Sequence, residues 1–155
     1  MSLDAIPVHV VNAGEGGLSG NAPPLLRELL TGVRRLLSDA EPSSIDLTAL
    51  PLTPADLDWL RDTLGQGEVR VTLDANGESS LDETACPGVW WVTHRNEQGA
   101  VVAQFLEVAF VPELVRAQVE DIRIGSAYLE SLMSENPSAR STAPYDEEAA
   151  SCRDL

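Results

Sequence analysis

The first half of the chain carries the hydrophobic pattern of two amphipathic helices. Leucine and valine recur at steps of three and four over residues 23–39, which predicts a helix with a wide apolar stripe. A second helix is expected after Thr53, because its hydroxyl can cap the first turn and Pro54 suits the first helical position. Residues 40–52 lie between them and predict a loop, since they are rich in proline and small polar residues.

The hydrophobic period changes from about 3.6 to two at residue 68. Val69, Val71 and Leu73 alternate with polar residues, which is typical of a strand with one buried face. Asn76 and Gly77 then suit a tight turn. Three further β-rich runs follow, so the middle of the chain predicts an antiparallel meander. Its expected strands are residues 68–74, 79–84, 89–94 and 100–110.

The two ends of the chain complete the predicted domain. Residues 6–12 favour a short strand, and the glycine-rich stretch 13–21 favours a loop. A last helix is expected over residues 118–133, followed by a flexible acidic tail at 134–155. We therefore expect one α+β domain over residues 1–133, with an antiparallel sheet of three to five strands and two or three helices packed on one face.

The net charge of the chain indicates which classes of partner it can bind. The chain has 25 acidic residues and 10 basic ones, all of them arginine, which gives a charge of −15. Such a field repels nucleic-acid phosphates and anionic lipid headgroups and favours a basic protein segment; acidity that only maintains solubility is the alternative. The N-terminus lacks the pattern of a secretory signal, and no apolar run could span a bilayer, so we expect a cytoplasmic protein.

Residues that commonly carry chemistry do not form a recognised motif. The glycine-rich loop lacks the lysine of a phosphate-binding loop, because the chain contains none. Cys86 is a candidate reactive thiol, but a structural role is favoured because no activating cation is adjacent in the sequence. Cys86 and Cys152 are too few for a disulfide framework, and His9 and His94 share no zinc-ligand spacing with them.

Carboxylates and tryptophans in the meander provide the other candidates. Asp82 or Glu83 could pair with Glu107 for acid–base chemistry, whereas hydrogen-bonded turn carboxylates are the favoured alternative. In a strand, Trp90 and Trp91 point to opposite faces. One is expected to fill the core beneath the helices. The other either faces outward as an anchor for a partner or is covered within the fold.

One part of the chain resembles a known family. The sequence runs from LGQGEV at residues 64–69, through DETACPGVWWV at 82–92, to FLEV at 105–108 and VPEL at 111–114. In this order the segments resemble the conserved domain of the HupH/HyaF hydrogenase expression/formation proteins, over about residues 51–122. Typical family members are longer and have two related domains, whereas this chain has room for one.

The resemblance implies an accessory protein in the maturation of an uptake nickel–iron hydrogenase. The resemblance further implies a chaperone that binds the precursor of the iron–sulfur small subunit before its twin-arginine export. A thioredoxin-like protein is the implied second partner. The family has no established catalytic residues, so we expect no enzyme and no cofactor. The acidity of the chain would suit a basic leader on the client. Pairing of two copies in a homodimer is left open.

The residues expected to bind the partner lie in or beside the family-like motif. They are Glu83, Thr84, Pro87, Gly88, Trp90, Trp91 and Glu107. An exposed sheet edge beside them would also allow an extended leader to add as a strand. The alternative function is a metal- or iron–sulfur-handling assembly protein, in which Cys86, His94 and carboxylates converge within one chain or across a dimer. A small enzyme that uses Glu83 and Glu107 is a third possibility.

Overall fold

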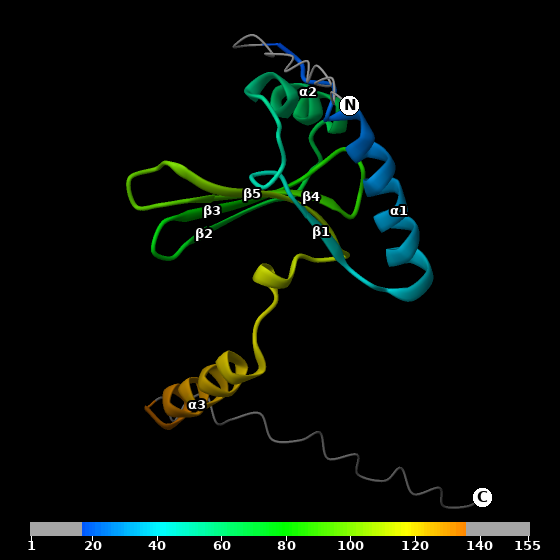
Figure 1. Cartoon of the computed structure of the whole chain (residues 1–155). Coiled ribbons are helices and arrows are strands. Elements are labelled where there is room, and N and C mark those ends of the chain that lie inside the picture. The colour runs from blue at the N-terminus through cyan, green and yellow to red at the C-terminus, as the bar shows by residue number, and fades with distance from the viewer. Residues whose placement is uncertain (1–16, 136–155) are drawn as a thin grey trace, which may run out of the picture. The chain divides into compact units, whose positions relative to one another are not determined.

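The chain divides into two compact units, Met1–Arg116 and Ala117–Leu155. The computed structural model describes residues 17–135 of the chain (Figure 1). The strand predicted over residues 6–12 therefore lies outside the described residues, as does the predicted tail from residue 136 onward.

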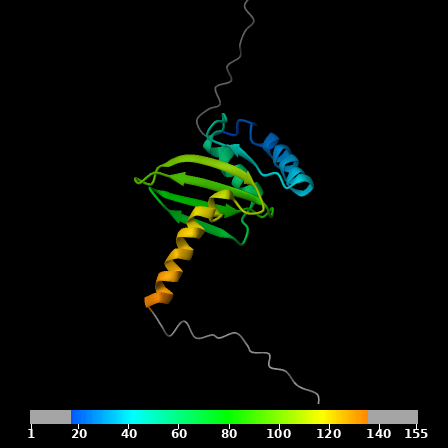
Figure 2. The same cartoon turned by 90° about the horizontal axis from the view of Figure 1, so that it is seen from below.

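A five-stranded antiparallel sheet forms the centre of the first unit. Its strand order is β1-β5-β4-β3-β2, and Figure 2 shows the strands side by side. Strands β2 to β5 are the predicted meander, so the α+β class with an antiparallel sheet and three helices is confirmed. The strands are β1 Ser43–Asp46, β2 Arg70–Asp74, β3 Glu78–Glu83, β4 Val89–Arg95 and β5 Val101–Val108.

Strand β1 corrects the loop predicted for residues 40–52. It carries one apolar residue, Ile45, which pairs with Leu106 of β5, so the strand is too short for a period of two to show. It forms because the outer side of β5 needs backbone hydrogen-bond partners. Asp46 ends the strand by accepting hydrogen bonds from the hydroxyl and backbone N–H of Thr48, which lower the pKa of its carboxyl group.

Helix α1, Pro23–Asp39, has the predicted bounds. Proline at its first positions costs no hydrogen bond, and its leucine stripe faces the sheet. Gly32 allows the helix to approach β1 closely, because a Cβ atom there would lie 2.8 Å from the Ser43 hydroxyl oxygen.

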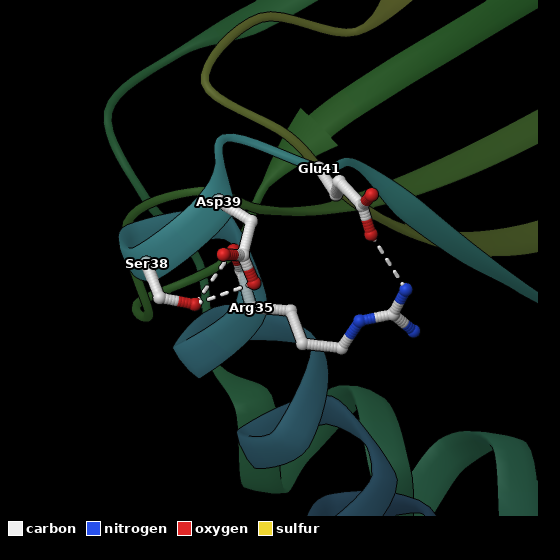
Figure 3. A network of polar contacts seen from close by, with 4 residues as sticks. All are labelled: Arg35, Ser38, Asp39 and Glu41. Atoms are coloured by element: carbon white, nitrogen blue, oxygen red, sulfur yellow. Dashed lines mark hydrogen bonds and ion pairs between the residues drawn. The ribbon is translucent and has the colours of Figure 1, made fainter.

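Exposed polar side chains surround the C-terminal end of α1. Ala40 takes the left-handed conformation with φ of 55° and donates its N–H one turn back. The Arg35 guanidinium lies 2.7 Å from the Glu41 carboxylate, and the Ser38 hydroxyl donates to Asp39 (Figure 3). Both side chains of the ion pair are more than half exposed, so the pair stabilises the helix end only slightly.

Helix α2, Pro54–Leu64, begins with the predicted cap. The Thr53 hydroxyl accepts from the Asp56 N–H at 3.2 Å, and the Asp56 carboxylate accepts from the Thr53 N–H at 2.8 Å. The same carboxylate accepts from the hydroxyl of Ser19 at 2.5 Å and from its N–H at 2.9 Å. The Ser19 hydroxyl, followed by the Thr53 N–H, lowers the pKa of Asp56 to about 2. Asp56 thus joins the preceding loop to α2.

The predicted turn between β2 and β3 is present. Asn76 and Gly77 both have positive φ, at 52° and 116°. A Cβ atom at Gly77 would lie 2.1 Å from the backbone oxygen of Arg95, so only glycine fits this position.

Helices α1 and α2 cover one face of the sheet and enclose the larger core (Figure 1). We call this group the helix-side core. Its buried members come from both helices, from the strands beneath them and from the residue after β1: Leu25, Leu29, Leu36, Leu47, Leu60, Leu64, Val89, Trp91, Leu106 and Val108.

The opposite face of the sheet carries a smaller core, here called the second core. Leu81, Trp90 and Val92 are buried in it, and Val71, Leu73 and Phe105 pack around them partly buried. Successive β4 residues supply the two cores alternately because strand side chains alternate between faces. Strand β4 is buried on both faces, which explains its uninterrupted apolar run.

A 3₁₀ turn, η1 Glu113–Val115, follows β5, and helix α3, Val119–Glu135, belongs to the second unit. The helix begins one residue later and ends two residues later than predicted, so residues 134 and 135 are helical and not part of a flexible tail. Val119, Ile122, Leu129 and Met133 share one side of it, as their spacing predicts. None of the helices in the described part of the chain is long and apolar enough to cross a membrane.

Candidate functional site

The motif DETACPGVWW forms the end of β3, a turn and the start of β4. The Thr84 N–H donates to the carbonyl of Val89, and its hydroxyl oxygen lies 3.2 Å from both the N–H and the carbonyl oxygen of Cys86. Gly88 has a φ of 83°, which glycine adopts without strain. Thr84, Pro87 and Gly88 therefore share a hydrogen-bonded turn whose shape the motif determines.

Glu83, Trp90 and Glu107 lie in one row across β3, β4 and β5, on the face with the second core. Two strand spacings, roughly 10 Å, separate the two glutamate backbones, and Trp90 stands between them. The Glu107 carboxylate accepts from the Glu113 N–H at 3.3 Å. The two glutamates do not meet as an acid–base pair, and Asp82 points to the other face of the sheet.

Neither tryptophan is an outward-facing anchor. Trp90 is 5% exposed and Trp91 is 3% exposed, so the alternative in which both are covered within the fold is the one observed. The Trp90 indole N–H donates to the carbonyl of Ala109 at 3.0 Å, which satisfies it inside the second core. The outward-facing alternative is not observed for Trp90 because Ala109, directly after β5, accepts its indole N–H.

Trp91 lies on the helix-covered face and contacts α2. The Arg61 guanidinium lies over its ring, with Cζ 4.4 Å from the ring centroid, as in a cation–π contact. Arg61 is exposed, and its guanidinium makes no hydrogen bond or ion pair among the residues that the structure describes. Its long side chain is thus held over the indole by this contact alone.

A cavity of about 290 Å³ lies at this margin of the helix-side core, between the end of α2 and the end of β3; we call it the Trp91 cavity. Asp82, on its border, is ion-paired with Arg70. The Asp62 and Glu83 carboxylates have no cation partner within residues 17–135. The residues lining the cavity are Arg61, Asp62, Gly65, Gln66, Asp82, Glu83, Thr84 and Trp91.

The indole N–H of Trp91 is buried without an acceptor. Its Nε1 atom has no hydrogen-bond partner in the described structure, in contrast to Nε1 of Trp90. An unsatisfied buried donor is uncommon and costs free energy, so it calls for an explanation. Here the donor belongs to a residue that lines a cavity, although the Nε1 atom itself is covered by its neighbours.

Comparison with known proteins identifies the family. Residues 20–135 match the family model described as HupH hydrogenase expression protein, C-terminal conserved region. The chain belongs to this HupH family. The resemblance seen in the sequence motifs is therefore confirmed, and the matched region is wider than the predicted 51–122.

Individual relatives carry consistent names. A solved structure, hydrogenase expression protein HupH from Thiobacillus denitrificans, is 58% identical, with a TM-score of 0.74 over 77% of this chain and 99% of that one. Hydrogenase expression/formation protein HoxQ of Azotobacter vinelandii is 35% identical over 66% of this chain and 37% of its own length. HupH of Rhizobium leguminosarum is 30% identical over 84% of this chain and 46% of its own length. The chain spans less than half of these curated relatives.

The residues predicted to bind the partner do not form one site in the structure. Glu83, Thr84 and Trp91 line the Trp91 cavity, and Trp90 and Glu107 do not. Glu83 borders the cavity at the end of β3, although it shares a row with Trp90 and Glu107. Arg61 and Asp62 were not predicted as site residues. They come from the last turn of α2, where the sequence shows only an ordinary polar helix surface. Their place beside Trp91 depends on how α2 packs on the sheet, which no local spacing reveals.

The residues of the metal-handling alternative do not meet. Cys86 is exposed in the turn before β4, and His94 lies near the other end of that strand. His94 Nδ1 lies 2.8 Å from the Ser79 hydroxyl, and its ring contacts Phe105 edge-on. Within residues 17–135, no group of three or more Cys, His, Asp or Glu is arranged to hold a metal ion.

Proposed function

We propose that this chain acts as an accessory protein in the expression and formation of a nickel–iron hydrogenase. The observation that carries the proposal is the HupH family match over residues 20–135, together with relatives named for hydrogenase expression and formation. The proposed activity is binding rather than catalysis. Its client is the precursor of the iron–sulfur small subunit, bound in the cytoplasm before export.

Electrostatics support a basic client segment. A chain with a net charge of −15 attracts a positively charged leader and speeds its encounter at low salt. We propose that the leader of the precursor is the segment attracted, and that a thioredoxin-like protein assists in the same complex.

We propose a contact that does not use Trp90. Trp90 is satisfied inside the second core, so it does not serve as an anchor. Strands β3 and β4 lie in the interior of the sheet, whereas β1 and β2 are its outer strands. Addition of an extended leader as a further strand therefore requires β1 or β2.

The test is a pull-down of purified small-subunit precursor by the full chain, with and without the leader, at 50 mM and 300 mM salt. We expect binding that requires the leader and weakens at the higher salt, because opposite charges are screened. An unrelated acidic protein of similar size and charge controls for nonspecific attraction. Failure to retain either form of the precursor at low salt would contradict the proposal.

A further inference from the structure

Two residues that line the Trp91 cavity carry hydrogen-bond donors without an acceptor in the described part of the chain. The buried Trp91 Nε1–H has no acceptor among residues 17–135. The Arg61 guanidinium above the ring likewise makes no hydrogen bond or ion pair there. The two residues come from β4 and α2, and both line the cavity. A ligand of this cavity must therefore offer hydrogen-bond acceptors such as carbonyl oxygens.

The border of the same cavity carries excess negative charge. Asp62, Asp82 and Glu83 line it, and Arg70 outside it neutralises only Asp82. Strand alternation directs the Glu83 side chain toward Trp90, so the Asp62 carboxylate is the clearest acceptor for a cation at the cavity mouth. Free anions are disfavoured by these carboxylates, and a neutral carbonyl acceptor linked to a cation is favoured.

We propose that the Trp91 cavity is the site that binds an arginine side chain and the adjoining backbone of an extended protein segment. A backbone carbonyl of the segment accepts the Trp91 Nε1–H, and the guanidinium pairs with Asp62. An extended basic peptide provides both groups at neighbouring positions, and arginine is preferred because its planar guanidinium pairs with carboxylates and stacks on indole rings. This site assignment rests on the proposed function, for which it names the contact.

In this arrangement Arg61 acts as a displaceable cover. The Nε1 atom is inaccessible while the side chains around the ring keep their present positions. Because Arg61 is exposed and its guanidinium has no other polar partner in the described region, a change of rotamer can uncover the indole. The incoming guanidinium then takes its place over the ring. Arg61 and Asp62 are adjacent in α2 but are expected to affect binding in opposite directions.

The direct test follows the indole N–H signals of the ¹⁵N-labelled full chain by NMR. The chain has three tryptophans, Trp59, Trp90 and Trp91, so the spectrum has three such signals, assigned with Trp→Phe variants. The probe is a blocked ten-residue peptide of alanine and serine with one central arginine. We expect the Trp91 signal to move downfield as its N–H gains an acceptor, while the Trp90 signal, already bonded to Ala109, stays in place.

Peptides of the same sequence with citrulline, lysine or glutamate at the centre report the chemistry recognised. Citrulline keeps the shape of arginine without its charge, and we expect it to bind at least about fivefold more weakly, the effect of one modest ion pair. Lysine should rank between arginine and citrulline. An unmoved Trp91 signal at millimolar arginine peptide, or equal binding of arginine and citrulline peptides, would overturn the assignment.

Variants of α2 provide the matched comparison. Asp62→Asn should weaken the arginine peptide about threefold to tenfold, whereas Asp58→Asn, one turn earlier with the same charge change, should not. Arg61→Ala should tighten binding about threefold, because a competing cation is removed, and Arg34→Ala on α1 is its control. Loss of binding in Arg61→Ala would overturn the role of this residue as a cover.

The same variants separate this site from the wider function. If the hydrogenase precursor binds the unmodified chain, and Asp62→Asn and Arg61→Ala bind it equally well, the site is wrong and the proposed function stands. If the precursor does not bind but the arginine peptide moves the Trp91 signal, the cavity recognises arginine segments and the client is a different protein.

Discussion

Trp90 and Trp91 are adjacent in β4 but lie on opposite faces of the sheet, and their buried indole N–H groups differ in hydrogen bonding. Trp90 enters the second core, where its N–H bonds to Ala109. Trp91 enters the helix-side core, which is larger and better covered, yet its N–H has no partner in the described structure. Depth of burial and completeness of hydrogen bonding are thus separate properties. The smaller core is complete, and the larger one has a gap at its margin.

The difference follows from how each face is covered. The second core is closed by side chains of the strands and by the backbone immediately after β5, so a carbonyl is close to Trp90. The helix-side core is closed by α1 and α2, in which most backbone carbonyls are used within the helices. The helix layer therefore covers Trp91 with side chains. The Arg61 side chain over the ring has hydrogen-bond donors only, so it cannot accept the Trp91 N–H.

The largest expected effect compares the hydrophobic contribution of the two cores. Leu106 and Leu81 are both fully buried strand leucines on opposite faces. Leu106→Ala should lower the free energy of unfolding by about 4 kcal/mol, because the helices above it cannot close the space. Leu81→Ala should lower it by about 2.5 kcal/mol, because the partly buried neighbours can shift inward.

Urea unfolding followed by tryptophan fluorescence measures both variants of this pair. Val102→Ala, at an exposed position of β5, is the control and should change the free energy of unfolding little. Equal losses for Leu106→Ala and Leu81→Ala would show that the two faces are equally rigid.

The second prediction concerns the polar anchor of the helix layer. Asp56→Ala removes the acceptor for both Ser19 and Thr53, so Tm should fall by several degrees. Asp46→Ala, which loses only local turn contacts, should lower Tm less. Calorimetry checks both variants. Equal falls would mean that the link from Ser19 to α2 contributes nothing beyond a local cap.

The Asp56 carboxylate also makes the free energy of unfolding depend on pH in a predictable direction. Its hydrogen bonds hold the pKa of Asp56 at about 2, below the ordinary value of 3.8. The carboxylate form is therefore favoured in the folded state. Its stabilising contribution is complete above pH 3.8 and is lost as the pH falls through about 2. Asp56→Asn should remove this part of the pH dependence in urea unfolding between pH 5 and 2. An unchanged slope would show that Asp56 does not carry it.

The sequence predicted the helices and strands better than it predicted the contacts between them. The leucine stripe predicted the bounds of α1, and Thr53 and Pro54 predicted the start of α2, because these signals are local. Strand β1 was missed because its single apolar residue, Ile45, leaves no pattern, and its existence depends on the free edge of β5.

The candidate site shows the same limit. Alternation along β4 correctly placed Trp90 and Trp91 on opposite faces. It did not reveal that Ala109 would satisfy Trp90 or that Arg61 would lie over Trp91, because both contacts join segments far apart in the sequence. Of the seven predicted site residues, Glu83, Thr84 and Trp91 line the Trp91 cavity.

A fourth prediction compares the two tryptophans directly. Trp90→Phe removes an indole N–H that is bonded and leaves the buried Ala109 carbonyl without its donor. Trp91→Phe removes a donor that has no partner in the described residues. Both changes lose similar ring area, so Trp90→Phe should cost about 1–2 kcal/mol more in the free energy of unfolding. Urea titrations of the two variants measure the difference. A larger cost for Trp91→Phe would mean that its N–H has an acceptor in solution.

The smallest expected effect concerns the cover over Trp91. Arg61→Ala should lower the free energy of unfolding by only about 0.5 kcal/mol, the typical size of an exposed cation–π contact. Arg61→Lys should recover part of this loss, because the ammonium group also interacts with the indole face. Thermal unfolding of both variants beside Arg34→Ala measures the effect. A loss above about 2 kcal/mol would make Arg61 a structural part of the helix-side core. A small loss means that Arg61 can leave the ring at little cost, as arginine binding in the Trp91 cavity requires.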